Sequence, residues 1–535
     1  MQFNFDNPYS STRIPVFGRN VVATSQPLAA QAGLLMLQSG GNAIDAAIAA
    51  AAALTICEPV SNGLGSDAFA LVWDKQTLHG LNASGTAPAA WDQAYFSKRH
   101  GGNIPMRGWD TVTVPGAVAG WAALHQRFGK LPFAECLQPA IRLGREGHGV
   151  GVIVARKWAA QTPHLQMQPG FAQSFMPNGR APAAGERFVF EAAAKALERI
   201  AQTAGRDFYE GAIAKALVDH SAANGGSLSA SDLAQYRPEW VTPISIGYRG
   251  YTMHEIPPNG QGIAALMALG MLEHFDLASL GADSVLSRHI QIEAMKAAFA
   301  DVYRYVADVR SMTAVRPSDL LDLSYLKSRA SKIKLDTAQD WQHGQPPSGG
   351  TIYLTACDES GMMVSFIQSN YMGFGSGIVE PNFGISLQNR GHGFSMDANH
   401  PNLVEPHKRP FQTIIPAFLT KDGKPQMSFG VMGGNMQPQG HVQTLVRMLD
   451  YGQNPQAACD AARWKVNRGL SVDVEERMGD TVRAGLKNLG HNLESIPDPY
   501  MDFGSGQFIW RQSDDIRQGY IAASDSRRDG LAAVY

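Results

Sequence analysis

The sequence "PPSGGTIYLTACDESGMMVSFIQS", residues Pro346–Ser369, decides how the chain is organised. After two glycines, apolar and polar side chains alternate in "TIYLTAC", and "MMVSFIQS" returns after the turn "DESG". Alternation with a period of two indicates strands, so this segment predicts a β-hairpin that begins at Thr351. The polar run before it, Leu335–Gly350, predicts a linker or an exposed loop. The chain thus divides at Gly350–Thr351 into a helix-rich part and a strand-rich part.

The helix-rich part still contains strands that need partners. "NVVATS" and "AFALVWD" are strand-like, and between them lie two predicted helices, "PLAAQAGLLMLQSGG" and "NAIDAAIAAAAALTI", the second capped by Asn42. From Trp109 to Tyr305 the periodicity is mostly helical. Because the strand-rich part has surplus strands to offer, we expect one layered α/β unit built from both parts, not two independent domains.

Composition excludes several classes of protein. The 535 residues carry a formal net charge of −2 without a long basic run, so nucleic acid is not an expected partner. The most apolar run, Ala43–Cys57, is too short to span a membrane and contains Asp45. The N-terminus lacks a secretory signal pattern, so a cytoplasmic location is expected. The four cysteines show no CxxC spacing, so neither a zinc site nor a disulfide framework is expected.

Common catalytic motifs are absent from the sequence. The glycines of "EPVSNGLGSD", Glu58–Asp67, satisfy neither phosphate-binding pattern and predict a tight turn. "HEIPP" at His254 lacks the second histidine of a zinc protease, and no GxSxG elbow exists. Ordinary serine hydrolases, zinc proteases and nucleotide-binding proteins therefore lose support.

Thr351 is the remaining candidate nucleophile. A threonine hydroxyl needs a base, and an N-terminal threonine carries one in its α-amine, whose ordinary pKa is about 7.7–8.0. An internal threonine gains that amine only if the preceding peptide bond is cut, and Gly349-Gly350 tolerates the strained backbone of an N→O acyl shift. The alternative is a Gly-Gly loop that enters a strand beginning with threonine. The residues alone favour this second interpretation.

Motifs along nearly the whole chain, from about Val21 to Tyr535, resemble those of the γ-glutamyltranspeptidase family and follow in the family's order. They are "ATSQPLAAQAGLLMLQSGGNAIDAAIAAAAALTICEP", "TVPGAVAGW", "PPNGQGI", "GSGIVEPNFGISLQNR", "KRPFQTIIPAFLTKDGK", "GVMGGNMQPQ" and "AASDSRRDGLAAVY". The resemblance implies the four-layered αββα sandwich of N-terminal-nucleophile hydrolases, an α/β fold. It also implies a proenzyme that cuts itself into a large fragment, residues 1–350, and a small fragment, residues 351–535, which stay together as one structural unit.

The resemblance also implies roles for four residues. Thr351 would be the nucleophile of self-cleavage and catalysis, with its freed amine as the base. Ser369 stands where the family has a threonine whose hydroxyl bonds near that amine. Gly433 and Gly434 match the glycine pair whose backbone N–H groups form the oxyanion hole.

The substrate-binding positions depart from the family's pattern. Relatives that cleave γ-glutamyl groups bind the α-carboxylate with an arginine, at whose position this chain has Ser84. Gly393 replaces the aspartate that binds the α-ammonium, and Gln412 and Thr413 replace two serines. Tyr371 replaces an asparagine. Since an ammonium buried without its counter-charge costs several kcal/mol, a γ-glutamyl group is not the expected substrate.

Arg390 stands where the family has a glutamine and suggests another substrate. A guanidinium offers a planar, bidentate site for a carboxylate. His392 adds a donor or serves a structural role in its glycine-rich loop. With Tyr371, Gln412 and Thr413, these residues form the predicted substrate site. They indicate a small-molecule amide that carries a carboxylate but no α-ammonium.

Among relatives, oxamate amidohydrolases and glutaryl-type cephalosporin acylases fit this description, and we favour the smaller substrate because Tyr371 and Gln412 fill space. A γ-glutamyl hydrolase or transpeptidase with a rearranged site is the alternative enzyme. An uncleaved, catalytically silent binding protein is the alternative outside enzymes. No cofactor or metal is expected. The expected partners are the two fragments of one precursor, with a homodimer of the two-fragment unit left open.

Overall fold

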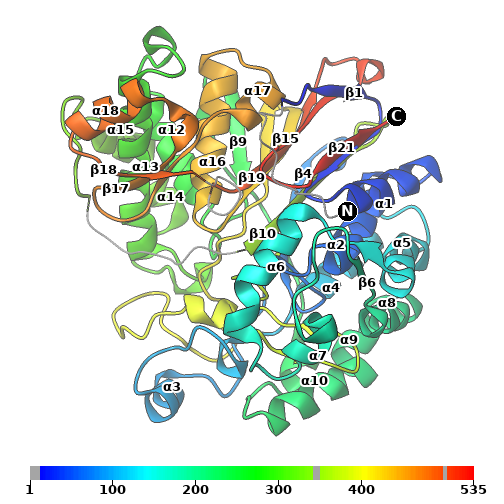
Figure 1. Cartoon of the computed structure of the whole chain (residues 1–535). Helices are drawn as coiled ribbons and strands as arrows, with labels where there is room; N and C mark the ends of the chain where they lie inside the picture. Colours follow the sequence, from blue (N-terminus) through cyan, green and yellow to red (C-terminus); the bar gives the residue numbers. More distant parts are fainter. Residues whose placement is uncertain (1–11, 342–349, 498–502) are drawn as a thin grey trace.

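The computed structural model describes residues 12–341, 350–497 and 503–535. Two seven-stranded sheets, each with only antiparallel neighbours, form its centre, and helices cover their outer faces (Figure 1). Half of the predicted linker, residues 342–349, lies outside the described residues. The structure is that of the uncleaved chain, in which Gly350 and Thr351 lie in one strand.

The first sheet has the predicted hairpin near its middle. In order across the sheet its strands are β21 (Leu531–Val534), β2 (Val21–Thr24), β10 (Gly350–Cys357), β11 (Met363–Tyr371), β3 (Asp67–Trp73), β4 (Leu78–Ala83) and β7 (Glu239–Val241). The hairpin β10–β11 is confirmed, and it pairs on either side with β2 and β3 from the helix-rich part. The early strands thus find the partners that the sequence predicted.

The second sheet also joins both parts of the chain. Its order is β1 (Val16–Gly18), β20 (Tyr520–Ser524), β19 (Ser505–Arg511), β15 (Lys424–Met432), β14 (Ala417–Lys421), β9 (Tyr251–Glu255) and β8 (Ile244–Tyr248). The hairpin β8–β9 lies inside the region expected to be mostly helical and forms one edge of this sheet. The strand β8 does alternate, with Ile244, Ile246 and Tyr248 more buried than the residues between them, but five residues are too few to stand out within a mostly helical region.

Apolar side chains from both sheets fill the space between them, among them Phe69, Ile367, Phe418 and Ile509. Two hydroxyl groups cross this layer, because Thr355 Oγ1 of β10 and Ser428 Oγ of β15 lie 2.7 Å apart. Close packing of β10 on β15 holds the start of β10, and with it Thr351, in a defined position.

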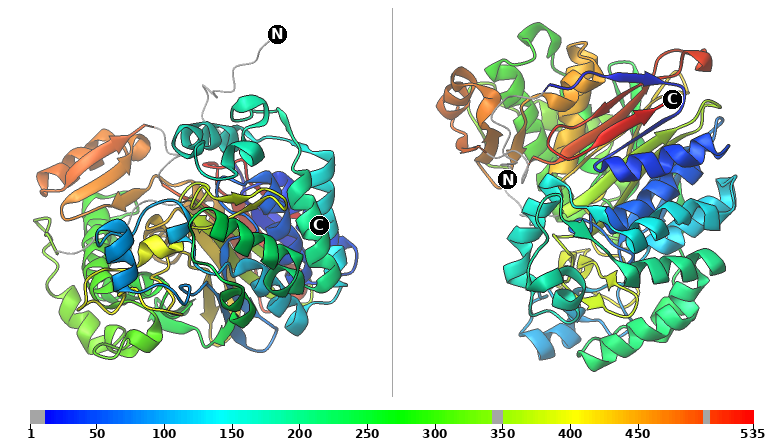
Figure 2. Two further views of the ribbon diagram at one scale, coloured as in Figure 1. Left: turned by 90° about the horizontal axis from the view of Figure 1, so that it is seen from below. Right: turned by 45° about the vertical axis from the view of Figure 1, so that its right-hand side comes forward.

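Helices cover the outer face of each sheet. α1 (Pro27–Gln38), α2 (Ala43–Cys57), α4 (Ala117–Phe128) and α5 (Phe133–Glu146) lie over the first sheet, and α12 (Ile263–Leu272), α13 (Val285–Tyr305) and α16 (Met436–Leu445) over the second (Figure 2). The predicted αββα sandwich is confirmed.

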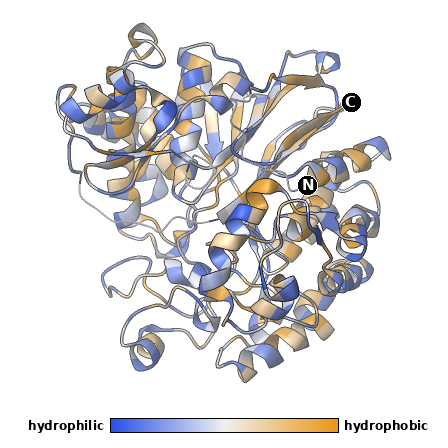
Figure 3. Ribbon diagram, viewed as in Figure 1, coloured by the Kyte–Doolittle hydropathy of each residue, from blue (hydrophilic) through white to orange (hydrophobic). Residues whose placement is uncertain are grey.

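The helix α2 shows why this layer packs closely. Every residue of α2 is buried, because its alanines let neighbouring elements approach on all sides. Asn42 caps it as predicted, since its Oδ1 accepts the backbone N–H groups of Ile44 and Asp45 at 3.0 and 3.1 Å. Other outer helices carry alternating bands of hydrophilic and hydrophobic residues (Figure 3), as expected for helices with one face in water.

Smaller elements surround this framework. The remaining helices are α3 (Gln93–His100), α6 (Val152–Leu165), α7 (Phe171–Phe175), α8 (Glu191–Thr203), α9 (Arg206–Glu210), α10 (Ala212–Ala223), α11 (Ala230–Gln235), α14 (Pro317–Leu320), α15 (Leu323–Ala330), α17 (Pro455–Asp460) and α18 (Asp480–Asn488). The remaining strands are β5 (His148–Gly149), β6 (Arg187–Phe188), β12 (Val379–Glu380), β13 (Ile385–Ser386), β16 (Trp464–Val466), β17 (Ser471–Glu475) and β18 (Asn492–Ile496). Among the described residues, no helix combines the length and apolar character needed to cross a bilayer.

Candidate active site

Thr351 lies at the start of β10 and is 3% exposed. Its hydroxyl donates to Ser369 Oγ at 3.1 Å, and Ser369 Oγ also accepts the backbone N–H of Tyr371 at 2.8 Å. The pairing of β10 with β11 is irregular between Gly350 and Ile352, so the backbone departs from the ladder at Thr351. The structure therefore brings Thr351 and Ser369 into contact in the uncleaved chain.

Gln437 of α16 approaches Thr351 from the second sheet. Its Nε2 lies 3.5 Å from Thr351 Oγ1, a long contact, and its Oε1 accepts the backbone N–H of Ile415 at 2.9 Å. The second bond determines which end of the amide faces Thr351. Sequence reasoning missed Gln437, and its signal was slight: a polar residue in the first turn of a helix that directly follows a glycine pair.

Gly433 and Gly434 form the turn between β15 and α16. Their φ angles of 120° and 60° lie in the region that favours glycine. The backbone carbonyl of Gly434 accepts the N–H of Gln437 at 3.2 Å and Nε2 of Gln261 at 2.8 Å. Gln437 thus bonds to the glycine turn through its backbone and contacts Thr351 through its side chain.

Arg390 begins a short 3-10 turn, Arg390–Gly393, and is 1% exposed. Its Nη1 donates to Thr413 Oγ1 at 2.7 Å, and its guanidinium lies 4.6 Å from the centre of the Tyr371 ring. Its Nε and Nη2 have no hydrogen-bond partner among the described residues. Burial lowers the pKa of Arg390 to about 10, so it stays charged at neutral pH. A buried cation with two unused donors suits an anionic ligand.

Asp67 is a buried acidic residue that sequence reasoning missed. It opens β3 and stands directly opposite Ser369 of β11. Its Oδ1 accepts the backbone N–H of Gly85 at 3.0 Å, and its Oδ2 accepts Nε2 of Gln412 at 2.9 Å. Burial raises the pKa of Asp67 to about 7, against the opposing effect of Arg390. An acidic residue at the head of an otherwise apolar strand was the available signal.

Tyr371 connects the nucleophile to Arg390. It ends β11 opposite Gly350 and has a φ of +77°, which is strained for a tyrosine. Such strain is frequent at functional sites. Burial raises the pKa of Tyr371 to about 12, so its hydroxyl stays neutral beside the guanidinium of Arg390. The neutral ring and the cation form a cation–π pair.

The other predicted binding residues differ in their placement. Gln412 and Thr413 contact Asp67 and Arg390, as described above, and are fully buried. Nδ1 of His392 lies 3.3 and 3.1 Å from the backbone carbonyls of Ile104 and Pro105, so this ring nitrogen holds a neighbouring loop. His392 is half-buried, and its contacts support the structural alternative.

Gly393 and Ser84 stand at the positions where the sequence predicts that the γ-glutamyl contacts are replaced. A Cβ on Gly393 would lie 2.9 Å from the carbonyl oxygen of Phe411, so a side chain there requires the backbone to shift. Ser84 donates its hydroxyl to Asn82 Oδ1 at 2.7 Å and accepts from Asn259 Nδ2 at 3.2 Å. Neither position offers a charged group to a substrate.

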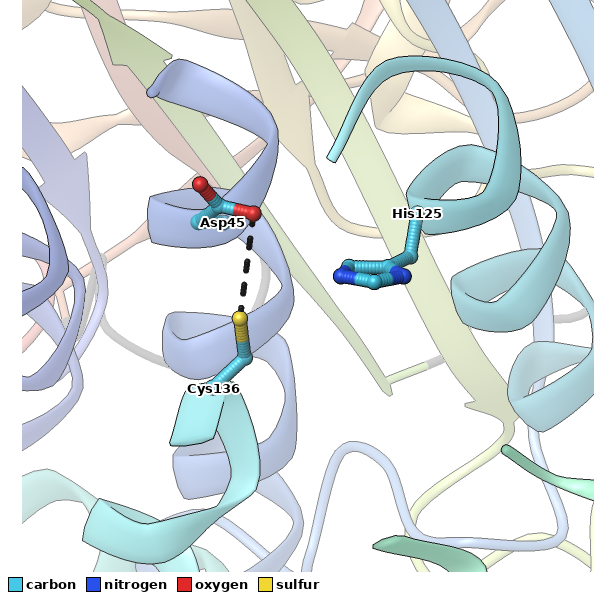
Figure 4. Close-up of side chains that lie close together, drawn as sticks. All are labelled: Asp45, His125 and Cys136. Atoms are coloured by element: carbon cyan, nitrogen blue, oxygen red, sulfur yellow. Dashed lines mark hydrogen bonds between the residues drawn. The ribbon is translucent and has the colours of Figure 1, made fainter. Parts of the chain in front are cut away.

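Two clusters have the residue types of a metal site. Asp45 of α2, His125 of α4 and Cys136 of α5 lie together (Figure 4). The carboxylate of Asp45, however, accepts the backbone N–H groups of Asn42 and Leu131 at 2.9 and 3.1 Å, and Nε2 of His125 lies 2.6 Å from the carbonyl of Leu131. These bonds fasten the start of α2 to the loop after α4, which is a structural role.

The second cluster contains His289, Glu293 and His491, all buried. Lys296 already neutralises Glu293 at 2.5 Å, and Nδ1 of His289 lies 2.8 Å from Nε2 of His491. The cluster therefore has its own cation, and we assign it a structural role as well.

Known proteins resemble this chain over nearly its full length. The model of the gamma-glutamyltranspeptidase family matches residues 29–535. The "glutathione hydrolase-like YwrD proenzyme" of Bacillus subtilis is 36% identical over 96% of this chain and 98% of its own. The "oxamate amidohydrolase proenzyme" of Klebsiella pneumoniae is 35% identical over 95% of this chain and 97% of its own.

A solved structure extends the likeness to three dimensions. The cephalosporin acylase from Bacillus halodurans superposes with a TM-score of 0.94 and 46% sequence identity, over 100% of this chain and 99% of that chain. These relatives differ in substrate but share one family and one fold. The chain described here therefore belongs to the gamma-glutamyltranspeptidase family of N-terminal-nucleophile hydrolases, whose members are made as proenzymes.

Proposed function

We propose that this protein is an autoprocessing amidohydrolase that hydrolyses the amide of a small carboxylate-bearing substrate, such as oxamate, through an ester on Thr351. The observation that carries the proposal is the unsaturated guanidinium of Arg390, which keeps two buried nitrogens unused within the described chain. A substrate carboxylate supplies two acceptors in one plane, which matches that need.

Self-cleavage comes first in the proposed sequence. The hydroxyl oxygen of Thr351 attacks the carbonyl carbon of Gly350, and the acyl group moves from nitrogen to oxygen. Water then hydrolyses the ester, which leaves a carboxylate on Gly350 and a free α-amine on Thr351. Ser369 and Gln437 contact the Thr351 hydroxyl in the uncleaved chain and hold it for this step.

The mature site would act by the same chemistry on the substrate. The free amine takes the proton of the Thr351 hydroxyl as its oxygen attacks the amide carbon. Backbone N–H groups of Gly433 and Gly434 hold the oxyanion, and the proton passes to the departing nitrogen, which leaves as ammonia. Water then attacks the acyl-Thr351 ester and releases the diacid. Arg390 holds the second carboxylate throughout.

A γ-glutamyl hydrolase or transpeptidase remains the alternative and receives less support. Such a substrate carries an α-ammonium and an α-carboxylate. Gly393 and Ser84 stand at the positions predicted to bind these two groups, and neither has a charged side chain. A second candidate has a specific observation in its favour: the 46% identical solved structure is named a cephalosporin acylase. A glutaryl-type acylase uses the same carboxylate but needs a longer acyl pocket.

An ammonia-release assay separates these candidates. The purified enzyme is given oxamate, malonamate and glutaramate, and in parallel a glutaryl cephalosporin and a γ-glutamyl anilide. We expect ammonia release to be fastest from the shortest amide acid. Glutamate release from the anilide far faster than ammonia release from any amide acid would overturn the proposal, and fastest cleavage of the glutaryl compound would favour the acylase.

Processing is tested on a denaturing gel with mass spectrometry of the smaller fragment. We expect two fragments, with Thr351 as the first residue of the smaller one, and a single chain for Thr351→Ala. A wild-type chain that stays intact on long incubation would instead indicate a catalytically silent binding protein. The cytoplasmic location and the homodimer stay predictions.

A further inference from the structure

The amide of Gln412 has one end bonded and one end unused. Its Nε2 donates to Asp67 Oδ2 at 2.9 Å, while its Oε1 has no partner in the described part of the chain, although the residue is fully buried. An ionised carboxylate can only accept, so Asp67 requires the NH2 end of the amide and leaves the carbonyl as the unused end. An unpaired buried carbonyl is unfavourable unless a ligand completes it.

Asp67 is itself held firmly. Gly85 donates to its other oxygen, and the β3–β11 pairing places it opposite Ser369. Arg390 is near enough to favour the ionised form of Asp67, and it bonds to Thr413, the residue after Gln412. One buried site thus offers unused donors on Arg390 and an unused acceptor on Gln412.

We infer that Asp67 is a positioning residue for substrate recognition: it orients Gln412 so that Oε1 accepts a neutral O–H or N–H group next to the carboxylate bound by Arg390. The inference rests on the proposed carboxylate site at Arg390 and names the substrate class more closely. The ligand is a carboxylate with a hydrogen-bond donor beside it, as in a 2-hydroxy acid or in oxamate, whose amide N–H groups adjoin the carboxylate.

The charges around Asp67 make this orientation dependent on pH. Arg390 and Arg409 face it from the segments around the substrate site, and Tyr209 and Tyr236 face it from α9 and the chain after α11. Burial raises the pKa of both tyrosines, so neither ionises near neutral pH. A protonated Asp67 can donate to Gln412 Oε1, which would turn the NH2 end toward the ligand and reverse the preference.

Three small carboxylates of similar size probe the site without turnover. Pyruvate, lactate and alanine carry a keto oxygen, a hydroxyl and an ammonium group on the carbon that bears the carboxylate. The keto oxygen can only accept a hydrogen bond, whereas the hydroxyl can also donate one. The dissociation constants follow from the rise in unfolding temperature with ligand concentration. At pH 8 we expect the mature wild type to bind lactate about five-fold more tightly than pyruvate, the value of one neutral hydrogen bond.

Asp67→Asn supplies the decisive comparison, because its amide can donate to Gln412 Oε1 and occupy it. In this variant the NH2 end of Gln412 faces the ligand and can donate to the keto group of pyruvate as well as to the hydroxyl of lactate. We therefore expect the preference for lactate over pyruvate to disappear in this variant at pH 8 and to shrink in the wild type at pH 5.5. The Thr351 amine is present in both the wild type and Asp67→Asn. Comparing their ligand affinities at the same pH therefore cancels its contribution. If Asp67→Asn does not fold, Gln412→Met, which keeps Asp67, is expected to lose the same preference.

The outcomes separate this inference from the proposed function. Equal binding of lactate and pyruvate, or a preference for lactate that survives in Asp67→Asn, overturns the role of Asp67 alone. Tightest binding of alanine, lost in Asp67→Asn, would assign Asp67 to an ammonium and also overturns it. Binding that is unchanged in Arg390→Met, or undetectable for all three ligands in the wild type, overturns the carboxylate site and with it the proposed function.

Discussion

Two arginines, Arg527 and Arg390, are each 1% exposed, but the numbers of their bonding partners differ. Arg527 pairs with Glu475 and Asp525 and donates to the carbonyls of Cys459 and Ala461. Burial opposes its charge, but the two carboxylates outweigh burial and raise the pKa of Arg527. At Arg390, burial prevails and lowers the pKa.

The acidic neighbours repeat the contrast. Burial opposes the charge of Asp525, but Arg527 and Arg463 outweigh it and lower its pKa, whereas burial raises the pKa of Asp67 despite Arg390. A saturated buried arginine fastens the chain to itself, and an unsaturated one is a candidate ligand site. The contrast indicates a stabilising role for Arg527 and supports the proposed role of Arg390 in substrate recognition.

The largest effect is expected when the saturated pair is broken. Arg527→Met should lower the free energy of unfolding by about 3–5 kcal/mol, because Glu475 and Asp525 would keep buried charges with fewer partners. Chemical unfolding measures this. The matched control is Arg477→Met. Arg477 bonds to the same Glu475 at 2.8 Å, but its side chain is 44% exposed. This substitution should therefore lower the free energy of unfolding by less than about 1 kcal/mol. Equal losses in both variants would remove the basis of the comparison.

The next effect concerns the unsaturated arginine. Arg390→Met should reduce amide hydrolysis about 100-fold, the value of the charged hydrogen bonds lost to the substrate carboxylate. Its unfolding temperature and its self-cleavage should stay close to wild type, because Arg390 bonds to few protein groups and not to Thr351. Initial rates of ammonia release and a denaturing gel measure both. If Arg390→Met unfolded readily but hydrolysed the substrate at the normal rate, Arg390 would have a structural role like that of Arg527.

The pH dependence of stability sharpens the contrast between the two aspartates. Burial raises the pKa of Asp67 from 3.8 to about 7, so the folded chain keeps a proton that the unfolded chain releases near pH 4. The stabilisation is complete below about pH 4 and is lost as the pH rises through 7. Between pH 5 and pH 8 the wild type should lose about 2–3 kcal/mol relative to Asp67→Asn.

Unfolding by denaturant at several pH values measures this difference. The control is Asp514→Asn at an exposed aspartate whose pKa is lowered by a hydrogen bond from Lys424, so it has no proton to release in this range. A wild type and an Asp67→Asn variant with parallel curves would show that Asp67 is already ionised at pH 5.

The smallest effect is expected at Ser369, which contacts the nucleophile without carrying charge. Ser369→Ala should slow self-cleavage and hydrolysis about ten-fold each, because the Thr351 hydroxyl loses the acceptor that holds it at 3.1 Å. Ser369→Thr, which keeps the hydroxyl, should stay close to wild type. Rates from timed gels and ammonia release measure the two reactions. Normal rates of both reactions in Ser369→Ala would show that this contact contributes to neither self-cleavage nor hydrolysis.

Local patterns sufficed wherever a few neighbouring residues determine the outcome. Alternation predicted the β10–β11 hairpin, and Asn42 before an alanine run predicted the start of α2. The short hairpin β8–β9 was not predicted, because its position in the sheet comes from pairing with β14, a strand more than 160 residues away in the sequence. Pairing energy between distant strands leaves little trace in the local sequence.

The sequence by itself determined the hairpin that begins at Gly350–Thr351 and, through its resemblance to a known family, the αββα architecture, because these depend on residue types in order along the chain. Cleavage at that junction and the replacement of the γ-glutamyl contacts stay predictions. Only the tertiary structure decided that Asp67 opens its strand opposite Ser369, that Gln437 reaches Thr351, and that Arg390 is buried with two nitrogens unused. The hydrogen-bond and ion-pair partners of a buried charge come from distant segments of the chain. Burial then determines the free energy that is lost if those partners are missing. That physical reason separates Arg390 from Arg527, which are both simply arginines in the sequence.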